Sequence, residues 1–122
     1  MPISNLRRAK QFIDLESIDT GSDSKPTDID GFIEFGGEMF IFYEFKLRGA
    51  QMSVGQRLAY EHVVDALIYA GRYACVLVCE HEVYECDESV IASESKVRET
   101  YFGNKWKCYQ PPLTISASTT CS

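Results

Sequence analysis

The stretch that decides the fold runs from Pro26 to Tyr60 and reads PTDIDGFIEFGGEMFIFYEFKLRGAQMSVGQRLAY. Two segments rich in β-branched and aromatic residues, 29–35 and 39–47, flank the pair Gly36-Gly37. Apolar runs separated by a glycine turn are typical of a β-hairpin. The sequence therefore predicts two antiparallel strands joined by a short turn. Both faces of this hairpin are largely apolar, which indicates central strands covered by helices on both sides.

Three charged residues interrupt the otherwise apolar strands, namely Asp30, Glu44 and Lys46. A buried charge is costly unless it is paired or binds a metal. Side chains alternate along a strand, so Glu44 and Lys46 share a face. A turn of three residues would place Asp30 directly opposite Glu44, where the two carboxylates need a cation or a proton between them. A turn of two residues would send Asp30 to the other face, and the apolar pattern leaves both registers open.

The segments around the hairpin predict helices on either side of it. We expect an amphipathic helix over residues 3–15 and a loop over 17–28. A long helix is expected over residues 54–70, with Ser53 as its N-cap and Gly71 as its C-terminal stop. The apolar run at 73–79 predicts a buried strand.

The C-terminal part of the chain has a weaker pattern. Residues 82–85 either extend the preceding strand or begin a loop, and 90–97 are compatible with a short helix. Residues 105–109 predict a final strand, after which Pro111-Pro112 ends regular structure and 111–122 form a polar tail.

Composition places the chain among ordinary globular proteins. It has 122 residues, 45% of them hydrophobic and 25% charged, which predicts a single domain. No apolar run reaches the ~20 residues that span a bilayer, and no secretory signal is recognisable, so we expect a cytoplasmic protein. Five cysteines without a CxxC pair indicate reduced thiols. A net charge of −6 argues against a nucleic-acid partner without excluding one, because the basic residues can share one side.

Together with the predicted elements, three motifs carry a resemblance: Asp30, the triplet Glu44-Phe45-Lys46, and Gln56-Arg57-Leu58-Ala59-Tyr60 on the following helix. They resemble the PD-(D/E)xK nuclease superfamily, in the QxxxY branch that contains RecB-type nuclease domains and phage lambda-type exonucleases. The VRR-NUC group has a comparable layout. The resemblance covers about residues 3–80 and departs from the family where Ile29, not proline, precedes Asp30.

The resemblance implies a restriction-endonuclease-like α/β (α+β) core, a mixed central sheet flanked by helices in the order α-β-β-α-β, as one nuclease-like domain over 1–122. It also implies Mg²⁺- or Mn²⁺-dependent hydrolysis of DNA by a small nuclease of phage or mobile-element type. The metal ligands would be Asp30, Glu44 and the backbone carbonyl of Phe45. Lys46 would orient the attacking water or stabilise charge, and hydrolysis of a phosphodiester needs these groups.

Gln56 and Tyr60 lie one helical turn apart, so both can face the same site. Each candidate has a plainer interpretation. Lys46 would form a structural ion pair, Tyr60 would be a core residue, and Gln56 would face solvent. The alternative function is a catalytically silent nuclease-fold protein that acts as a nucleic-acid-binding, protein-binding or regulatory module.

Further candidates surround this set. Asp28 competes with Asp30 or assists it, and Glu16 is the acidic candidate near the end of the first predicted helix. The candidates for contact with DNA are Arg48, Arg57, Lys105 and Lys107. Trp106 would either stack on a nucleic-acid strand or pack inward, and we favour packing inward. A chain of 122 residues offers little surface to enclose a duplex, so a homo-oligomer or a partner protein is expected.

Overall fold

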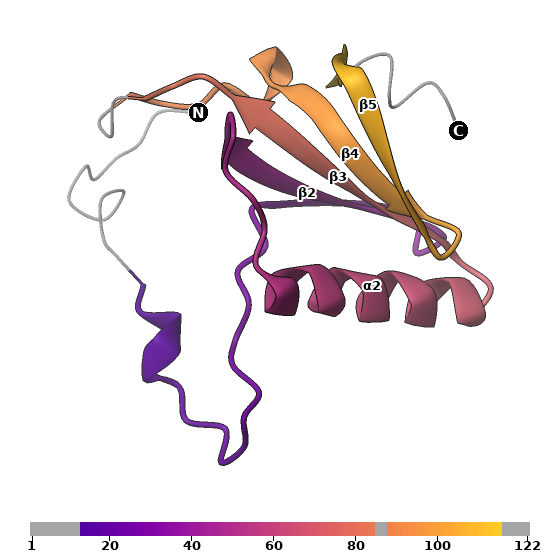
Figure 1. Cartoon of the computed structure of the whole chain (residues 1–122). Helices are drawn as coiled ribbons and strands as arrows, with labels where there is room; N and C mark the ends of the chain where they lie inside the picture. Colours follow the sequence, from indigo (N-terminus) through magenta and orange to yellow (C-terminus); the bar gives the residue numbers. More distant parts are fainter. Residues whose placement is uncertain (1–12, 85–87, 116–122) are drawn as a thin grey trace.

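The computed structural model describes residues 13–84 and 88–115. Within them the secondary-structure elements are η1 (Leu15–Ser17), β1 (Gly31–Phe35), β2 (Met39–Leu47), α2 (Val54–Tyr69), β3 (Tyr73–His81), η2 (Ala92–Glu94), β4 (Lys96–Phe102) and β5 (Lys105–Thr114). Apart from the short 3-10 helices η1 and η2, the order is β-β-α-β-β-β (Figure 1). The described chain is therefore an α+β fold, with one α-helix and a five-stranded sheet.

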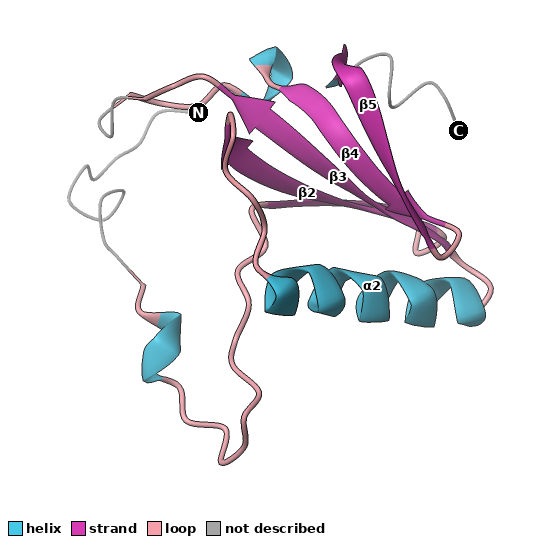
Figure 2. Ribbon diagram, in the orientation of Figure 1, coloured by secondary structure: helices cyan, strands magenta, loops and turns pink. Residues whose placement is uncertain are grey.

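The five strands form one mixed sheet in the order β1-β2-β3-β4-β5. Strands β2 and β3 are parallel because α2 crosses between them, and all other neighbours are antiparallel. Figure 2 shows α2 lying along one face of the sheet. The prediction of a mixed sheet is confirmed. The predicted order α-β-β-α-β, with helices on both faces, is wrong for the part of the chain that the structure describes.

The first predicted helix, over 3–15, lies almost wholly outside the described residues. Of its last residues, Ile13 and Asp14 are not helical, and Leu15 begins the 3-10 helix η1. Within the described ranges, no helix is long and apolar enough to cross a membrane.

The hairpin has the odd-length turn on which the candidate site depends. Residues 36–38 connect the strands, with Phe35 opposite Met39 and Gly31 opposite Tyr43. Gly36 and Gly37 have φ angles of 58° and 72°, a left-handed conformation that glycine adopts at little cost. Strand β2 has the predicted bounds, whereas β1 begins at residue 31, two residues later than predicted.

Helix α2 has the two end signals expected from the sequence. The Ser53 hydroxyl accepts a hydrogen bond from the Gln56 backbone N–H at 3.1 Å, which makes Ser53 the N-cap. Gly71 follows the helix with a φ of 85°, and its N–H donates to the Ile68 carbonyl. Both predictions are confirmed, and α2 ends at Tyr69, one residue earlier than expected.

The predicted short helix over 90–97 is wrong, since only Ala92–Glu94 form a 3-10 turn and β4 begins at Lys96. The physical reason is pairing with β3 along a strand in which Val97, Glu99 and Tyr101 are buried: Tyr101 belongs to the cluster under α2, whereas Val97 belongs to the cluster on the other face because the register shifts between Val78 and Cys79. This pairing also provides hydrogen-bond partners for the backbone of the segment.

The prediction that Pro111-Pro112 ends regular structure is also wrong, because β5 continues to Thr114. Strand β5 lies at the edge of the sheet, and the register shifts between Val97 and Glu99, opposite the prolines. An edge strand with an irregular register tolerates residues that lack an N–H donor. Residues 116–122 of the predicted tail lie outside the described residues.

Alternate residues of the strands enter two apolar clusters, one on each side of the sheet. The cluster under α2 includes Phe42, Tyr60, Val64, Val76 and Val78. The cluster on the opposite face consists of Ile41, Leu77, Cys79 and Val97. Because β2 contributes to both clusters, its sequence is apolar on both faces. Cys75, Cys79 and Cys108 carry free thiols.

Candidate functional site

The site is built around Glu44, whose side chain is only 2% exposed between β2 and α2. The Gln56 amide donates to Glu44 Oε2 at 2.9 Å, and the Tyr60 hydroxyl donates to Oε1 at 3.1 Å. Residues four apart on a helix share a face, so both donors reach the same carboxylate. Gln56 therefore does not simply face solvent, and Tyr60 is both a core residue and a hydrogen-bond donor at the site.

Asp30 lies immediately before β1. Because Gly31 pairs with Tyr43, the hairpin register places Asp30 opposite Glu44. Its Oδ2 accepts a hydrogen bond from the backbone N–H of Phe45 at 2.9 Å. Its charge and a hydrogen bond to Glu44 both raise the pKa of Glu44, so the two carboxyl groups are neighbours. The alternative register, in which a two-residue turn places Asp30 on the opposite face from Glu44, is excluded.

The backbone of Phe45 presents its carbonyl on the side of Asp30. In an extended strand, the N–H and C=O of one residue point toward the same neighbouring strand. Since the Phe45 N–H donates to Asp30, the carbonyl of Phe45 also points to that side, beyond the first residue of β1. The Phe45 ring lies on the opposite face, stacked 6.1 Å from Tyr43.

Lys46 shares the face of Glu44, as strand alternation predicts. Its Nζ lies 3.9 Å from Glu44 Oε2, and the side chain is 24% exposed. An amine at this distance forms a loose ion pair, so it is free to turn toward a third group. Lys46 is therefore a partly exposed positive charge beside the buried carboxylate.

The environment of Glu44 favours its protonated form. Burial is the largest cause and the charge of Asp30 the second, and together they raise the pKa of Glu44 from 4.5 to about 7. The charge of Lys46 and the hydrogen bond from Tyr60 act in the opposite direction. The raised pKa has a consequence for stability, because the folded state binds the proton more tightly than the unfolded state.

In metal-free buffer, we expect the free energy of unfolding to fall as the pH rises from 4.5 to about 7. The Glu44 contribution is complete below the unfolded pKa and is lost as the pH passes the folded pKa, a change of about 3 kcal/mol. Urea unfolding at several pH values measures it, with Glu44→Gln as the control that cannot titrate. Parallel pH profiles for the two proteins would show that Glu44 is not protonated in the folded state.

The two carboxyl groups fit a small divalent cation. The exposed carboxylate of Asp30 lies beside the buried carboxyl group of Glu44, and oxygen ligands suit Mg²⁺ and Mn²⁺. No three acidic, histidine or cysteine side chains of the described residues gather into a metal site of their own. A cation bound here would have two carboxylates and the carbonyl of Phe45 as its protein donors, a small set that suits Mg²⁺ because this ion keeps several of its waters.

The two acidic helpers differ in position. Asp28 is exposed, and its charge contributes to raising the pKa of the Tyr60 hydroxyl, although burial is the largest cause. Asp28 therefore lies at the edge of the site. Glu16 belongs to η1, which lies apart from the sheet in Figure 1, and the structure does not bring it to the site.

Arg57 forms an ion pair with Glu99, a residue that was not among the candidates predicted from the sequence. Its two terminal nitrogens donate to the two oxygens of Glu99 at 3.0 and 3.1 Å. The guanidinium also lies 4.1 Å from the ring centre of Trp106, whose indole N–H donates to Glu61. The inward packing of Trp106 is confirmed. Local sequence gave no clear signal for Glu99, because its burial depends on the pairing of β4 with β3.

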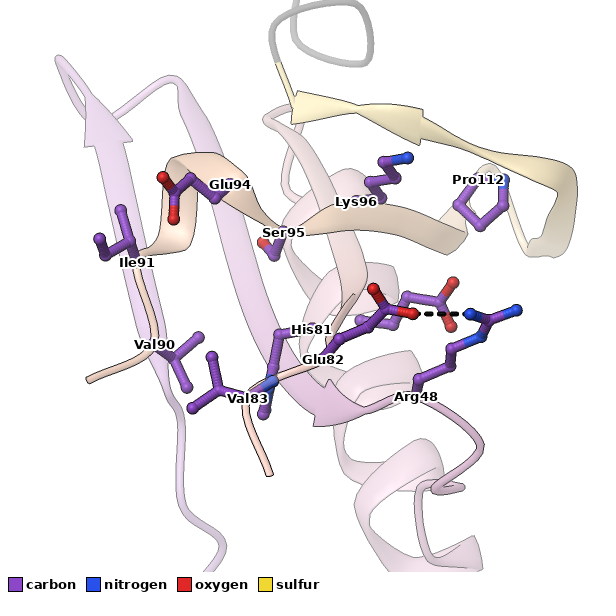
Figure 3. Close-up of a pocket in the computed structure, with 11 residues that line it drawn as sticks. Arg48, His81, Glu82, Val83, Val90, Ile91, Glu94, Ser95, Lys96 and Pro112 are labelled. Atoms are coloured by element: carbon purple, nitrogen blue, oxygen red, sulfur yellow. Dashed lines mark hydrogen bonds and ion pairs between the residues drawn. The ribbon is translucent and has the colours of Figure 1, made fainter. Parts of the chain in front are cut away.

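The other basic candidates do not form one surface. Arg48 pairs with Glu82 at 2.6 Å beside a pocket of about 390 Å³ that none of the five predicted catalytic residues lines (Figure 3). Lys107 lies 5.2 Å from the ring of Tyr109. Lys105 is the cross-strand neighbour of Phe102 at the β4–β5 turn, and this turn lies at the end of the sheet opposite to Glu44. Their contact with DNA stays a prediction.

Fold and site together define an α+β protein in which a buried carboxyl group, Glu44, lies between a β-hairpin and a helix beside the exposed carboxyl group of Asp30. A comparison with protein-family models, with curated proteins and with solved structures finds no match.

Proposed function

We propose that the protein is a small metal-dependent deoxyribonuclease of the PD-(D/E)xK type. The observation that carries the proposal is the convergence of side chains from three parts of the chain on one carboxylate pair. These side chains are Asp30 beside β1, Glu44 and Lys46 on β2, and Gln56 and Tyr60 on α2. These residues bring two acids, an amine and hydrogen-bond donors together, and phosphodiester hydrolysis needs groups of these kinds.

Each residue has a role that follows from its contacts. Asp30, Glu44 and the Phe45 carbonyl would hold Mg²⁺ or Mn²⁺. When bound, the cation neutralises phosphate charge and lowers the pKa of a bound water. Gln56 and Tyr60 each donate to one oxygen of Glu44 and thereby orient its carboxylate.

Lys46 completes the set because it is both near Glu44 and open to solvent. At 24% exposure its amine can reach a phosphate oxygen or the attacking water, while Glu44 at 2% cannot. A substrate phosphate would therefore approach from the side of Lys46 and Asp30. The positive charge of Lys46 stabilises the negative charge that develops on the phosphate oxygens.

The test is cleavage of single- and double-stranded DNA in Mg²⁺, in Mn²⁺ and in EDTA, together with the melting temperature in each. We expect cleavage with either metal and none in EDTA. A metal concentration tenfold above its dissociation constant should stabilise the folded protein by about 1.4 kcal/mol. The shift should vanish in Glu44→Gln. Absence of both cleavage and stabilisation would reject the proposal.

A second candidate is a catalytically silent protein that binds nucleic acid or another protein. The burial of Glu44 favours it, since each carboxylate oxygen already accepts a hydrogen bond from a protein side chain. In this case Mg²⁺ leaves the melting temperature unchanged. Glu44→Gln would then stabilise the protein at neutral pH, because it removes a buried carboxyl group beside Asp30 and keeps the hydrogen-bond acceptor.

A further inference from the structure

An apolar groove lies directly beside the carboxylate pair. It has a volume of about 540 Å³ and is lined by Ile29, Asp30, Gly31, Phe32, Phe40, Phe42 and Leu67. Asp30 is the one charged residue among those that line it, and it belongs to the carboxylate pair as well. The groove is therefore continuous with the candidate site, and its walls suit an uncharged group.

Aromatic rings form the wall of this groove. The Phe32 ring lies 6.1 Å from Phe40 at an interplanar angle of 24°, and 5.1 Å from Phe42. These two rings support Phe32 from β2, yet its side chain is still 50% exposed. A supported and half-exposed ring can stack against a planar ligand at little entropic cost.

We propose that this groove binds an unpaired nucleobase next to the scissile phosphate, and that the substrate is therefore single-stranded DNA. The inference rests on the proposed nuclease function. A nucleotide carries a charged phosphate and an apolar planar base side by side. The site has the same arrangement, with Lys46 and a cation held by Asp30 for the phosphate and Phe32 for the base.

The preference for single-stranded DNA follows from how much of the face of a base is exposed in a duplex and in a single strand. In a duplex, both faces of an internal base are covered by its neighbours, so no face is free to meet Phe32. An unpaired base exposes its face, and stacking on an aromatic side chain is the usual way in which proteins bind single strands. The net charge of −6 also makes tight binding through phosphates alone unfavourable.

Two variants of Phe32 and one control test the proposal. Phe32→Leu keeps an apolar side chain without a ring, and Phe32→Tyr keeps the ring. Phe35→Ala is the control, because Phe35 is on the same strand, is 53% exposed and does not line the groove. Fluorescence anisotropy of a labelled oligothymidine and of a blunt hairpin duplex, both in Ca²⁺, measures binding. A melting curve checks that each variant is folded.

We expect Phe32→Leu to weaken binding of the single strand roughly fivefold or more, the effect of losing one stacked base. Phe32→Tyr and Phe35→Ala should bind within about twofold of the wild type. The inference is overturned if Phe32→Leu binds the single strand as the wild type does, or if duplex binding falls equally. It is also overturned if Phe32→Leu only converts a dimer to a monomer in light scattering, because the groove then holds a second copy.

Binding and cleavage are read separately, so the two proposals can fail separately. If the wild type does not cleave DNA but Phe32→Leu weakens its binding to the single strand, the protein has the base-binding site and is not a nuclease. If the wild type cleaves DNA and Phe32→Leu changes neither binding nor cleavage, the protein is a nuclease that lacks the base-binding site.

Discussion

Replacing Glu44 by glutamine is expected to lower metal-dependent DNA cleavage by a factor of roughly a thousand, which corresponds to about 4 kcal/mol of transition-state stabilisation. The reason is that Glu44 supplies a charged oxygen to the proposed metal and accepts from Gln56 and Tyr60. Glutamine keeps an oxygen acceptor at the same place but loses the negative charge. Cleavage of a labelled DNA strand under single-turnover conditions measures the effect.

The matched control for this experiment is Glu38→Ala, which removes an exposed carboxylate from the turn of the same hairpin. Its activity should equal that of the wild type. The Glu44→Gln protein must also be at least as stable as the wild type at neutral pH, so that lost activity is not lost folding. If Glu44→Gln keeps a large part of the activity, Glu44 is not a metal ligand and the proposed site is wrong.

Replacing Arg57 by methionine is expected to reduce the free energy of unfolding by about 3 kcal/mol, because Arg57, itself 31% exposed, is the partner of a buried carboxylate whose charge would be left uncompensated. Glu99 is 6% exposed, and both of its oxygens accept from Arg57. The substitution also removes the cation over the Trp106 ring. Urea unfolding at pH 7 measures the change.

Arg48→Met is the comparison, since it breaks an ion pair with Glu82 in which both side chains are more than half exposed. Exposed pairs contribute less than about 1 kcal/mol, so this variant should be nearly neutral. The double variant Arg57→Met, Glu99→Met should recover most of the lost stability, because no buried charge remains. Equal stability of Arg57→Met and Arg48→Met would show that the Glu99 pair does not hold α2 on the sheet.

The Arg57 variant also separates two roles for one residue. If Arg57 contacts DNA, Arg57→Met should weaken DNA binding more strongly at low salt than at high salt. If its role is to hold α2 against β4, stability should fall while the salt dependence of binding stays unchanged. The structure supports the second role through Glu99 and Trp106.

Much of the first part of the fold was predictable from local patterns. The strand at 39–47, the Ser53 cap and the stop at Gly71 depend on neighbouring residues, and the structure has each of them. The C-terminal strands were not predictable in this way. The segment at 90–97 reads as a short helix until β3 offers a partner, and the prolines of β5 are tolerated because that strand lies at the edge.

For the site, the sequence by itself determined which residues are candidates and that a three-residue turn would bring Asp30 to Glu44, because side-chain alternation is a local property, whereas the structure decided that the turn has this length. Only the tertiary structure decided that Glu44 is buried with a raised pKa, that Glu99 engages Arg57, and that an aromatic groove adjoins Asp30. Burial, charge pairing and cavities depend on residues that are distant in the chain and become neighbours only when the sheet and α2 pack together.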